Sequence, residues 1–111
     1  GMLRQLQYLI AIADYGSFRR AADAVHVSQP TLSLQLRALE ARLGAQLVER
    51  NETPVQLTPI GREVVNRARR VLLSVQDIEE LAGAPDLLPN VLTALVTAMS
   101  IALVSVLVML A

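Results

Sequence analysis

Residues 17–44 constrain the fold of this chain more than any other segment does. Ser17 and Ser28 each precede a run of residues compatible with a helix, and serine is a preferred N-cap residue. Pro30 falls in the first turn of the second run, where proline is tolerated because its missing N–H would have no partner there. The segment therefore predicts two helices joined by a tight turn that ends just before Ser28.

The second predicted helix has an apolar face and a polar edge. Its leucines recur at helical spacing and are expected to face the core: Leu32, Leu36, Leu39 and Leu43. The side chains outside that stripe are mostly small or polar: Gln29, Thr31, Ser33, Gln35 and Arg37. Such groups suit the major groove of DNA, because Gln can pair with adenine in two places and Arg with guanine. A helix-turn-helix reader has this arrangement, although many helical domains of other function share the pattern.

A short hairpin is predicted directly after these helices. Gly44 is a suitable C-cap, residues 46–50 alternate like a strand, residues 51–54 form a turn, and residues 55–57 form a second strand. The first helix of the chain is expected to bury Leu3, Leu6, Leu9, Ile10 and Ala13. The predicted fold is mainly α: a winged helix-turn-helix with three helices and a two-stranded wing, followed by a long dimerisation helix and a hydrophobic C-terminal helix.

The long helix is predicted over residues 59–82, with Thr58 as its N-cap. Apolar residues recur along it at alternating steps of four and three, as in an a/d seam: Val64, Ala68, Val71, Val75, Ile78 and Ala82. The helix would be roughly 36 Å long at 1.5 Å per residue, too long for so small a domain to cover. We therefore expect a homodimer or a tetramer through this seam, with packing onto the same domain as the alternative.

The composition argues against an enzyme. The chain has no cysteine and one histidine, so neither a metal site nor a cofactor is expected, and His26 is interpreted as a structural turn residue. Its carboxylates are scattered, and it contains no glycine-rich phosphate-binding motif. Ten basic and ten acidic residues give a formal net charge of zero. Affinity for nucleic acid would therefore depend on where the charges lie rather than on their number.

Residues 3–83 resemble the N-terminal DNA-binding domain of the LysR-type bacterial transcriptional regulators. The matching segments are LRQLQYLIAIADYGSF, AADAVHVSQPTLS, QLRALEARLGAQLVER and LTPIG. The resemblance implies a sequence-reading helix over residues 28–43, a wing over the adjacent minor groove, and dimerisation through the long helix. A winged helix of the multiple-antibiotic-resistance type is a remoter alternative, because the SQPTLS turn argues against it.

The resemblance also implies which residues contact double-stranded DNA. The groove-facing residues would be Gln29, Pro30, Thr31, Ser33 and Gln35. The cations near phosphates would be Arg37, Arg4, Arg19 and Arg20, with Arg50 beside the wing. Two residues depart from the family pattern: Leu34, where relatives often carry Arg or another polar residue, and Glu52 in a wing that is usually basic. An aliphatic side chain at 34 could contact only a thymine methyl or nothing, and the acidic wing predicts weak, less salt-dependent binding.

Residues 91–111 contain no charged side chain. As a helix they would span roughly 31 Å, about the thickness of a bilayer core. Small residues share one face, which suits close helix pairing in lipid: Ala94, Ala98, Ala102 and Ser105. Three interpretations stay open: a tail anchor in the cytoplasmic membrane, a soluble helix packed between protomers, and the product of a truncated or frame-shifted gene.

The predicted organisation is a DNA-binding domain (1–58), a dimerisation helix (59–83), a linker (84–90) marked by Gly83, Pro85 and Pro89, and a hydrophobic helix (91–111). The predicted function is a cytoplasmic, sequence-specific transcriptional regulator that binds a two-fold symmetric operator as a dimer. No small-molecule effector site is expected, because the chain has no residues for the larger sensing domain of the family. The alternative is an interaction protein that dimerises with full-length relatives and modulates them, with DNA contact incidental.

Overall fold

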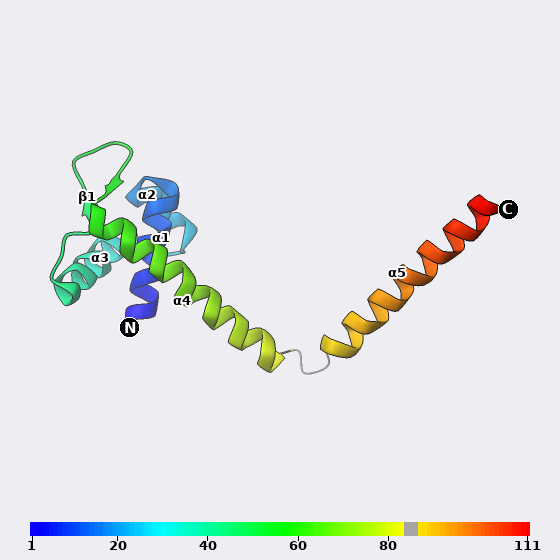
Figure 1. The fold of residues 1–111 in the computed structure, drawn as a ribbon. Helices are drawn as coiled ribbons and strands as arrows, with labels where there is room; N and C mark the ends of the chain where they lie inside the picture. The colour runs from blue at the N-terminus through cyan, green and yellow to red at the C-terminus, as the bar shows by residue number, and fades with distance from the viewer. Residues whose placement is uncertain (84–86) are drawn as a thin grey trace. The chain divides into compact units, whose positions relative to one another are not determined.

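The computed structural model describes residues 1–83 and 87–111, and the side chains of residues 1–83 and 91–111. The elements, in chain order, are α1 (Met2–Tyr15), α2 (Phe18–Ala24), α3 (Gln29–Leu43), β1 (Val48–Glu49), β2 (Gln56–Leu57), α4 (Pro59–Gly83) and α5 (Leu87–Leu110) (Figure 1). The chain forms two compact units, Gly1–Val75 and Gln76–Ala111. The predicted class, a mainly α winged helix-turn-helix followed by two long helices, is confirmed.

Serine side chains begin the two helices of the predicted helix-turn-helix. The Ser17 Oγ accepts a hydrogen bond from the Arg20 N–H at 3.3 Å, and α2 starts at the next residue. The Ser28 Oγ accepts from the Thr31 N–H at 3.2 Å, and α3 follows with proline in its first turn. Both N-caps were expected from sequence, because a capping side chain satisfies a backbone N–H a few residues along the same chain.

The connections between these helices use left-handed backbone conformations. Gly16 ends α1 and Gly44 ends α3, each with φ 65°. His26, in the turn between α2 and α3, has φ 59°, a conformation that is uncommon for residues other than glycine. The Val27 N–H donates to the Ala22 carbonyl at 3.0 Å and closes this turn. His26 therefore lies in the turn, where the sequence placed it.

The core is built from aliphatic side chains of α1, α2, α3, the hairpin and the first part of α4. The largest fully buried side chains are Leu9, Ile12, Leu32, Leu36, Leu39, Leu47 and Val48. Two predicted core residues are exposed instead, Leu3 by 40% and Leu43 by 41%. Leu3 lies at the free start of α1, whose buried face also includes Tyr8. Leu43 lies in the last turn of α3, where residues 41–44 are all exposed.

The two strands pair antiparallel, with Val48 opposite Leu57, and form a shorter hairpin than the sequence predicted. Each strand has two residues, whereas residues 46–50 and 55–57 were expected to be extended. Next to the ladder, the Thr58 N–H donates to the Leu47 carbonyl at 3.0 Å, whereas the Leu47 N–H donates to the Glu40 carboxylate at 2.8 Å. At its other end the Val55 N–H donates to the carbonyl of Gly16 at 2.9 Å. The wing is therefore held to α3 and to the end of α1.

α4 begins against the hairpin. The Thr58 Oγ1 accepts from the Gly61 N–H at 3.0 Å and donates to the Gln46 carbonyl at 2.7 Å, which confirms the predicted cap. One turn further on, Val65 is buried in the core. An ion pair of 2.5 Å between Arg69 Nη2 and Asp14 Oδ1 joins α4 to α1. The hydrogen bond to Asp14 raises the pKa of Arg69 above its ordinary value.

The helices on either side of the predicted linker have bounds that differ from those predicted. α4 includes Gly83, which was expected to stop it. α5 begins at Leu87 rather than at residue 91, so Pro89 lies in its first turn. Proline is tolerated there because N–H groups of the first turn have no carbonyl acceptor within the helix, so the missing N–H of proline costs no hydrogen bond. Pro85, the third residue used to predict a linker, lies outside the described residues.

Candidate nucleic-acid interface

α3 presents one face to the core and the other to solvent. Leu32, Leu36 and Leu39 are 0% exposed and fix the rotation of the helix about its own axis. The opposite face consists of exposed residues at helical spacing: Pro30, Leu34, Arg37, Ala38 and Ala41. Because the buried leucines come from three successive turns, the exposed face is rigidly oriented. Such a rigid outward face is what recognition of the regular surface of a DNA duplex requires.

The N-terminal end of α3 brings three of the predicted base-contacting residues together. Gln29, Pro30 and Thr31 are all exposed there. The Ser28 hydroxyl donates to Thr31 Oγ1 at 2.8 Å while its oxygen accepts the Thr31 N–H. Since the Thr31 oxygen acts as acceptor in this bond and its O–H has no acceptor among the described residues, that O–H can donate to a phosphate or a base. The cap therefore also orients a side chain of the candidate interface.

Ser33 and Gln35 are less exposed than the sequence suggested. Both are half-buried, because each stands next to the leucine stripe around the helix. The Gln35 Oε1 accepts a hydrogen bond from Gln5 Nε2 at 3.2 Å, so its carboxamide is engaged with α1. Gln5 is 7% exposed and was not predicted as part of the site. No sequence spacing links Gln5 to Gln35, and the contact of Ser33 and Gln35 with DNA stays a prediction.

The predicted phosphate-contacting arginines lie on three helices. Arg37 is exposed on α3, Arg19 and Arg20 at the start of α2, and Arg4 on α1. The Arg20 guanidinium lies 5.6 Å from the centre of the Tyr15 ring, a cation–π contact that restrains it without neutralising it. Within residues 1–83 and 91–111, none of these four arginines forms an ion pair. Their charges are therefore available to an anionic partner.

Arg50, predicted to contact DNA beside the wing, forms an ion pair within the chain, and its contact with DNA stays a prediction. Its Nη2 lies 2.5 Å from Glu40 Oε1, and the side chains of Arg50 and Glu40 are only 25% and 12% exposed. Burial favours a raised pKa for Glu40, but the hydrogen bonds from Arg50 and the Leu47 N–H outweigh it and hold the pKa below its ordinary value. The pair fastens the wing to α3. It leaves Glu52 as the charged residue of the exposed loop 51–54.

The residues of the predicted dimerisation seam differ in burial along α4: those at its start are buried or packed against the core, and those further on are exposed or half-buried. Ala68 is 1% exposed and Val64 packs against the core cluster, so the start of the seam is used within the single chain. Val71 and Ile78 are 44% and 64% exposed, and Val75 is half-buried. The sequence pattern did not distinguish the start of this series from its more exposed remainder, because a helix that packs on its own domain and one that packs on a partner share the same apolar spacing.

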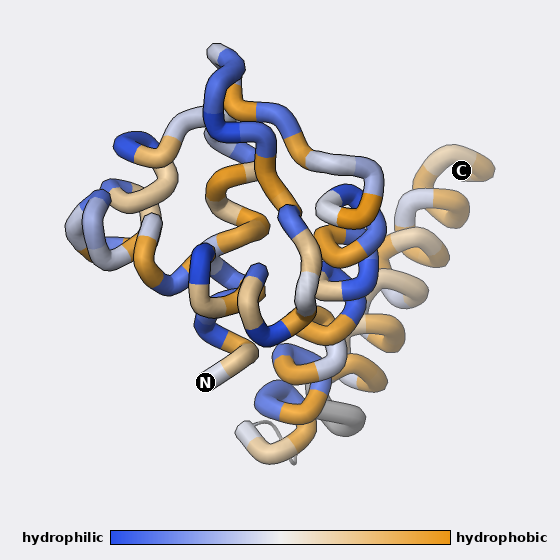
Figure 2. The backbone as a smooth tube through the Cα atoms, turned by 90° about the vertical axis from the view of Figure 1, so that its left-hand side faces the viewer, coloured by the Kyte–Doolittle hydropathy of each residue, from blue (hydrophilic) through white to orange (hydrophobic). Residues whose placement is uncertain are grey.

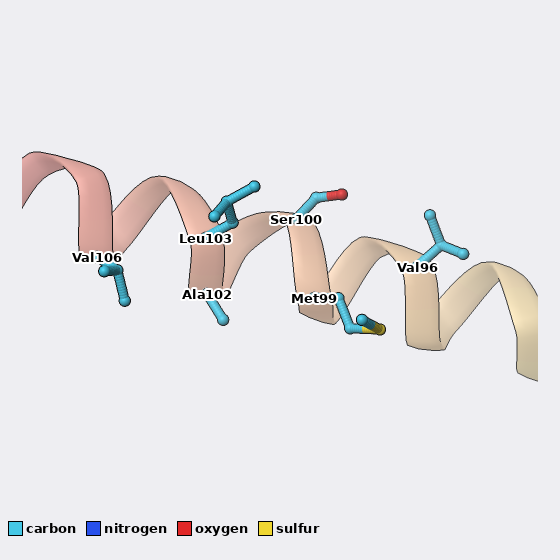
Figure 3. A pocket seen from close by; sticks show the side chains of 6 residues that line it. All are labelled: Val96, Met99, Ser100, Ala102, Leu103 and Val106. Atoms are coloured by element: carbon cyan, nitrogen blue, oxygen red, sulfur yellow. The ribbon is translucent and has the colours of Figure 1, made fainter.

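Among the described residues, 1–83 and 91–111, no three His, Cys, Asp or Glu side chains come together as metal ligands would. A hollow of 470 Å³ between α1, α2 and α4 is lined by Arg4, Asp14, Tyr15 and Leu72 among others. A second hollow is lined entirely by side chains of α5, which lie along a single helix in Figure 3. That second hollow is therefore the open surface of one helix rather than a ligand cavity.

The comparisons with known proteins agree with this geometry. Residues 3–62 match the family model of the bacterial regulatory helix-turn-helix protein, lysR family. The Escherichia coli K12 DNA-binding transcriptional dual regulator OxyR is 50% identical over 81 residues, which are 73% of this chain and 27% of OxyR. The SDS degradation transcriptional activation protein of a Pseudomonas strain is 50% identical over 70 residues, which are 63% of this chain and 23% of that protein.

Solved structures show the same likeness. The DNA-binding domain of BenM in complex with benA site 1 DNA has a TM-score of 0.71 at 38% identity, covering 73% of this chain and 91% of that one. The DNA complex of the CbnR DNA-binding domain has a TM-score of 0.70 at 40% identity, covering 75% of this chain and 95% of that one. The chain spans about a quarter (27%) of the length of its first curated relatives. With a helix-turn-helix, a wing and a long helix in the family order, the chain belongs to the LysR family of bacterial regulatory helix-turn-helix proteins.

Proposed function

We propose that this protein is a sequence-specific DNA-binding transcriptional regulator that inserts the exposed face of α3 into the major groove. The observation that carries the proposal is the outward position of Gln29 and Thr31 on a helix whose opposite face is fully buried. Solved relatives with the same fold were determined in complex with DNA. A groove-reading helix needs these two properties together: exposed hydrogen-bonding groups and a fixed orientation.

Each exposed group has a separate role in the proposed complex. Gln29 can bind adenine through two hydrogen bonds, and the free O–H of Thr31 can donate to a base or a phosphate. Arg37, Arg19 and Arg4 would position the domain on the backbone, which sets register without reading sequence. Arg50 and Arg69 are paired with carboxylates, so they contribute little to the release of counterions. We therefore propose that affinity falls less steeply with salt than it would if these two arginines were also free.

The proposed assembly is a homodimer formed along the exposed part of α4, with a tetramer as the alternative oligomer. Val71 and Ile78 keep apolar surface exposed there, at 44% and 64%. Helices of this length bury such residues against an equivalent helix in many dimers. Two copies related by a two-fold axis would bring two α3 helices to half-sites one turn of DNA apart, roughly 34–36 Å.

Selection of duplexes from a random DNA pool, using the intact protein in a mild detergent, tests this function. We expect enrichment of a two-fold symmetric motif with half-sites about one helical turn apart. Enrichment of a single asymmetric half-site would contradict the dimer. No enrichment over the starting pool would contradict DNA reading and would favour the alternative, a protein that acts by dimerising with longer relatives.

A second observation favours a location at a membrane. The segment Val91–Leu110 has a mean hydropathy of 2.5, and none of it is buried. Figure 2 shows this helix without any strongly hydrophilic residue. At 1.5 Å per residue it spans roughly 30 Å, the thickness of a bilayer core. Large apolar side chains such as Leu95, Leu103 and Val104 surround the helix, whereas a pairing seam would cover one stripe only. We propose that α5 holds the DNA-binding domain at the cytoplasmic face of a membrane.

Carbonate extraction of bacterial membranes that contain the protein tests this anchor. We expect the protein to stay in the membrane pellet. Replacing both Leu103 and Val104 by arginine should move it to the soluble fraction, because each arginine costs roughly 2.5–3.5 kcal/mol at the centre of a spanning helix. The matched control places the two arginines at Met109 and Leu110, where long side chains can reach the interface. Extraction of the unmodified protein into the soluble fraction would contradict the anchor.

A further inference from the structure

The centre of the exposed face of α3 is apolar. Leu34 is 67% exposed, and Pro30 and Ala38, one turn before it and one turn after it, are also exposed. Ala41 continues the same stripe. The hydrogen-bonding groups lie at the rim of this face: Gln29 and Thr31 at its N-terminal end and Arg37 at its side. Two further polar side chains, Ser33 and Gln35, are turned partly toward the core.

An apolar side chain in this position can recognise one feature of a base pair. The edges that bases present in the major groove are hydrogen-bond donors and acceptors, with the C5 methyl group of thymine as the apolar exception. Packing Leu34 against that methyl removes apolar surface of both from water. Packing it against the donor or acceptor of another base would strip that group of water and give it no partner. The chemistry of this face therefore favours thymine.

We propose that Leu34 is a specificity-determining residue that selects thymine at one position of each half-site through contact with the thymine methyl. This inference rests on the proposed DNA-binding function. Pro30 and Ala38 flank the leucine with small apolar groups, so the methyl would lie in a shallow apolar surface rather than beside a polar side chain. Gln29 and Thr31 would read or position the neighbouring pairs, and Arg37 would contact the backbone.

Uracil substitution tests the inference, because uracil pairs like thymine and lacks only the methyl group. In the selected duplex, each thymine of a half-site is replaced in turn, and the affinity of the intact protein in mild detergent is measured at fixed salt. We expect one position per half-site at which uracil weakens binding about fourfold, the effect of losing one buried methyl-sized group. Replacement in both half-sites together should weaken binding roughly 15-fold.

The variant Leu34→Ala should bind thymine and uracil duplexes equally, because it lacks the contact partner. Since Leu34 is mostly exposed, this variant should fold as the parent does. Leu43→Ala is the matched control: it truncates another exposed leucine of α3, beyond the stripe, and should keep the full uracil effect.

The outcomes separate this inference from the proposed function. If no duplex is selected at all, the DNA-binding function fails, and the role of Leu34 fails with it. If a duplex binds tightly but uracil and thymine bind equally at every position, only the inference is overturned. It is likewise overturned if the uracil effect persists in Leu34→Ala, because the methyl would then be read by another residue.

Discussion

Gly61→Ala is expected to lower the free energy of unfolding by about 3 kcal/mol, the upper end of the usual range for overpacking a core. A Cβ at this position would lie 2.0 Å from the carbonyl oxygen of Leu47 and 2.9 Å from its carbonyl carbon. That carbonyl cannot easily move aside, because it accepts the Thr58 N–H at 3.0 Å. The Leu47 N–H is held in turn by Glu40. α4 would therefore have to shift away from the hairpin.

Denaturant unfolding of the intact protein, followed by tyrosine fluorescence, measures this effect. Both tyrosines lie in α1, and Tyr8 is buried in the core, so the signal reports on the DNA-binding domain alone. Gly83→Ala is the matched control at the far end of the same helix, where an added Cβ meets nothing within 4 Å. The control should leave stability unchanged or raise it slightly. Equal midpoints for the two variants would show that the close approach at Gly61 is not a constraint.

The second large effect is expected at the pair that fastens the wing to α3. Glu40→Ala should cost about 2–3 kcal/mol, because it removes a charged acceptor from two partners at once. The Leu47 N–H loses its hydrogen bond of 2.8 Å. Arg50 loses its carboxylate partner, and its Nε is buried without a partner among the described residues even before the change. The matched control, Glu63→Ala, breaks an ion pair to Arg67 whose side chains are 68% and 75% exposed, and should cost about 0.5 kcal/mol or less.

The same pair predicts a dependence of stability on pH. The pKa of Glu40 is lower in the folded protein than its ordinary value of 4.5. A carboxyl with a lowered pKa stabilises the fold above its unfolded pKa, and the stabilisation is lost as pH falls through the folded pKa. Unfolding midpoints should therefore drop more steeply below about pH 4.5 in the parent than in Glu40→Gln. Parallel curves for the two proteins would contradict a stabilising charge at Glu40.

Local signals in the sequence predicted much of the fold. The caps at Ser17, Ser28 and Thr58 depend on a side chain and a backbone group three residues apart, so they can be read along the chain. The same holds for the glycine that ends α3. The buried face of α1 was harder to place, because apolar residues occupy more than one side of that helix and periodicity alone does not choose between them.

The sequence predicted which residues of the candidate site are exposed near the cap of α3 and at Arg37, but it did not predict two pairings within the site. Gln29 is exposed as expected, whereas Gln35 bonds to Gln5 and Arg50 to Glu40. Both of those pairings join residues on different elements, and no local pattern encodes them. Leu34 could be noted from sequence as unusual, but its place at the centre of the exposed face required the rotation that the buried leucines give to α3.

If the exposed end of α3 reads base pairs, removing the side chain of Gln29 should change which bases the protein prefers. A mobility-shift titration at fixed salt compares the intact protein with Gln29→Ala on the selected duplex and on duplexes changed at single adenines. Gln7→Ala, the same change at an exposed glutamine of α1, is the control. We predict that Gln29→Ala loses discrimination at one adenine per half-site, by about tenfold or more, while Gln7→Ala keeps it. Undiminished discrimination by Gln29→Ala at every position would contradict the claim.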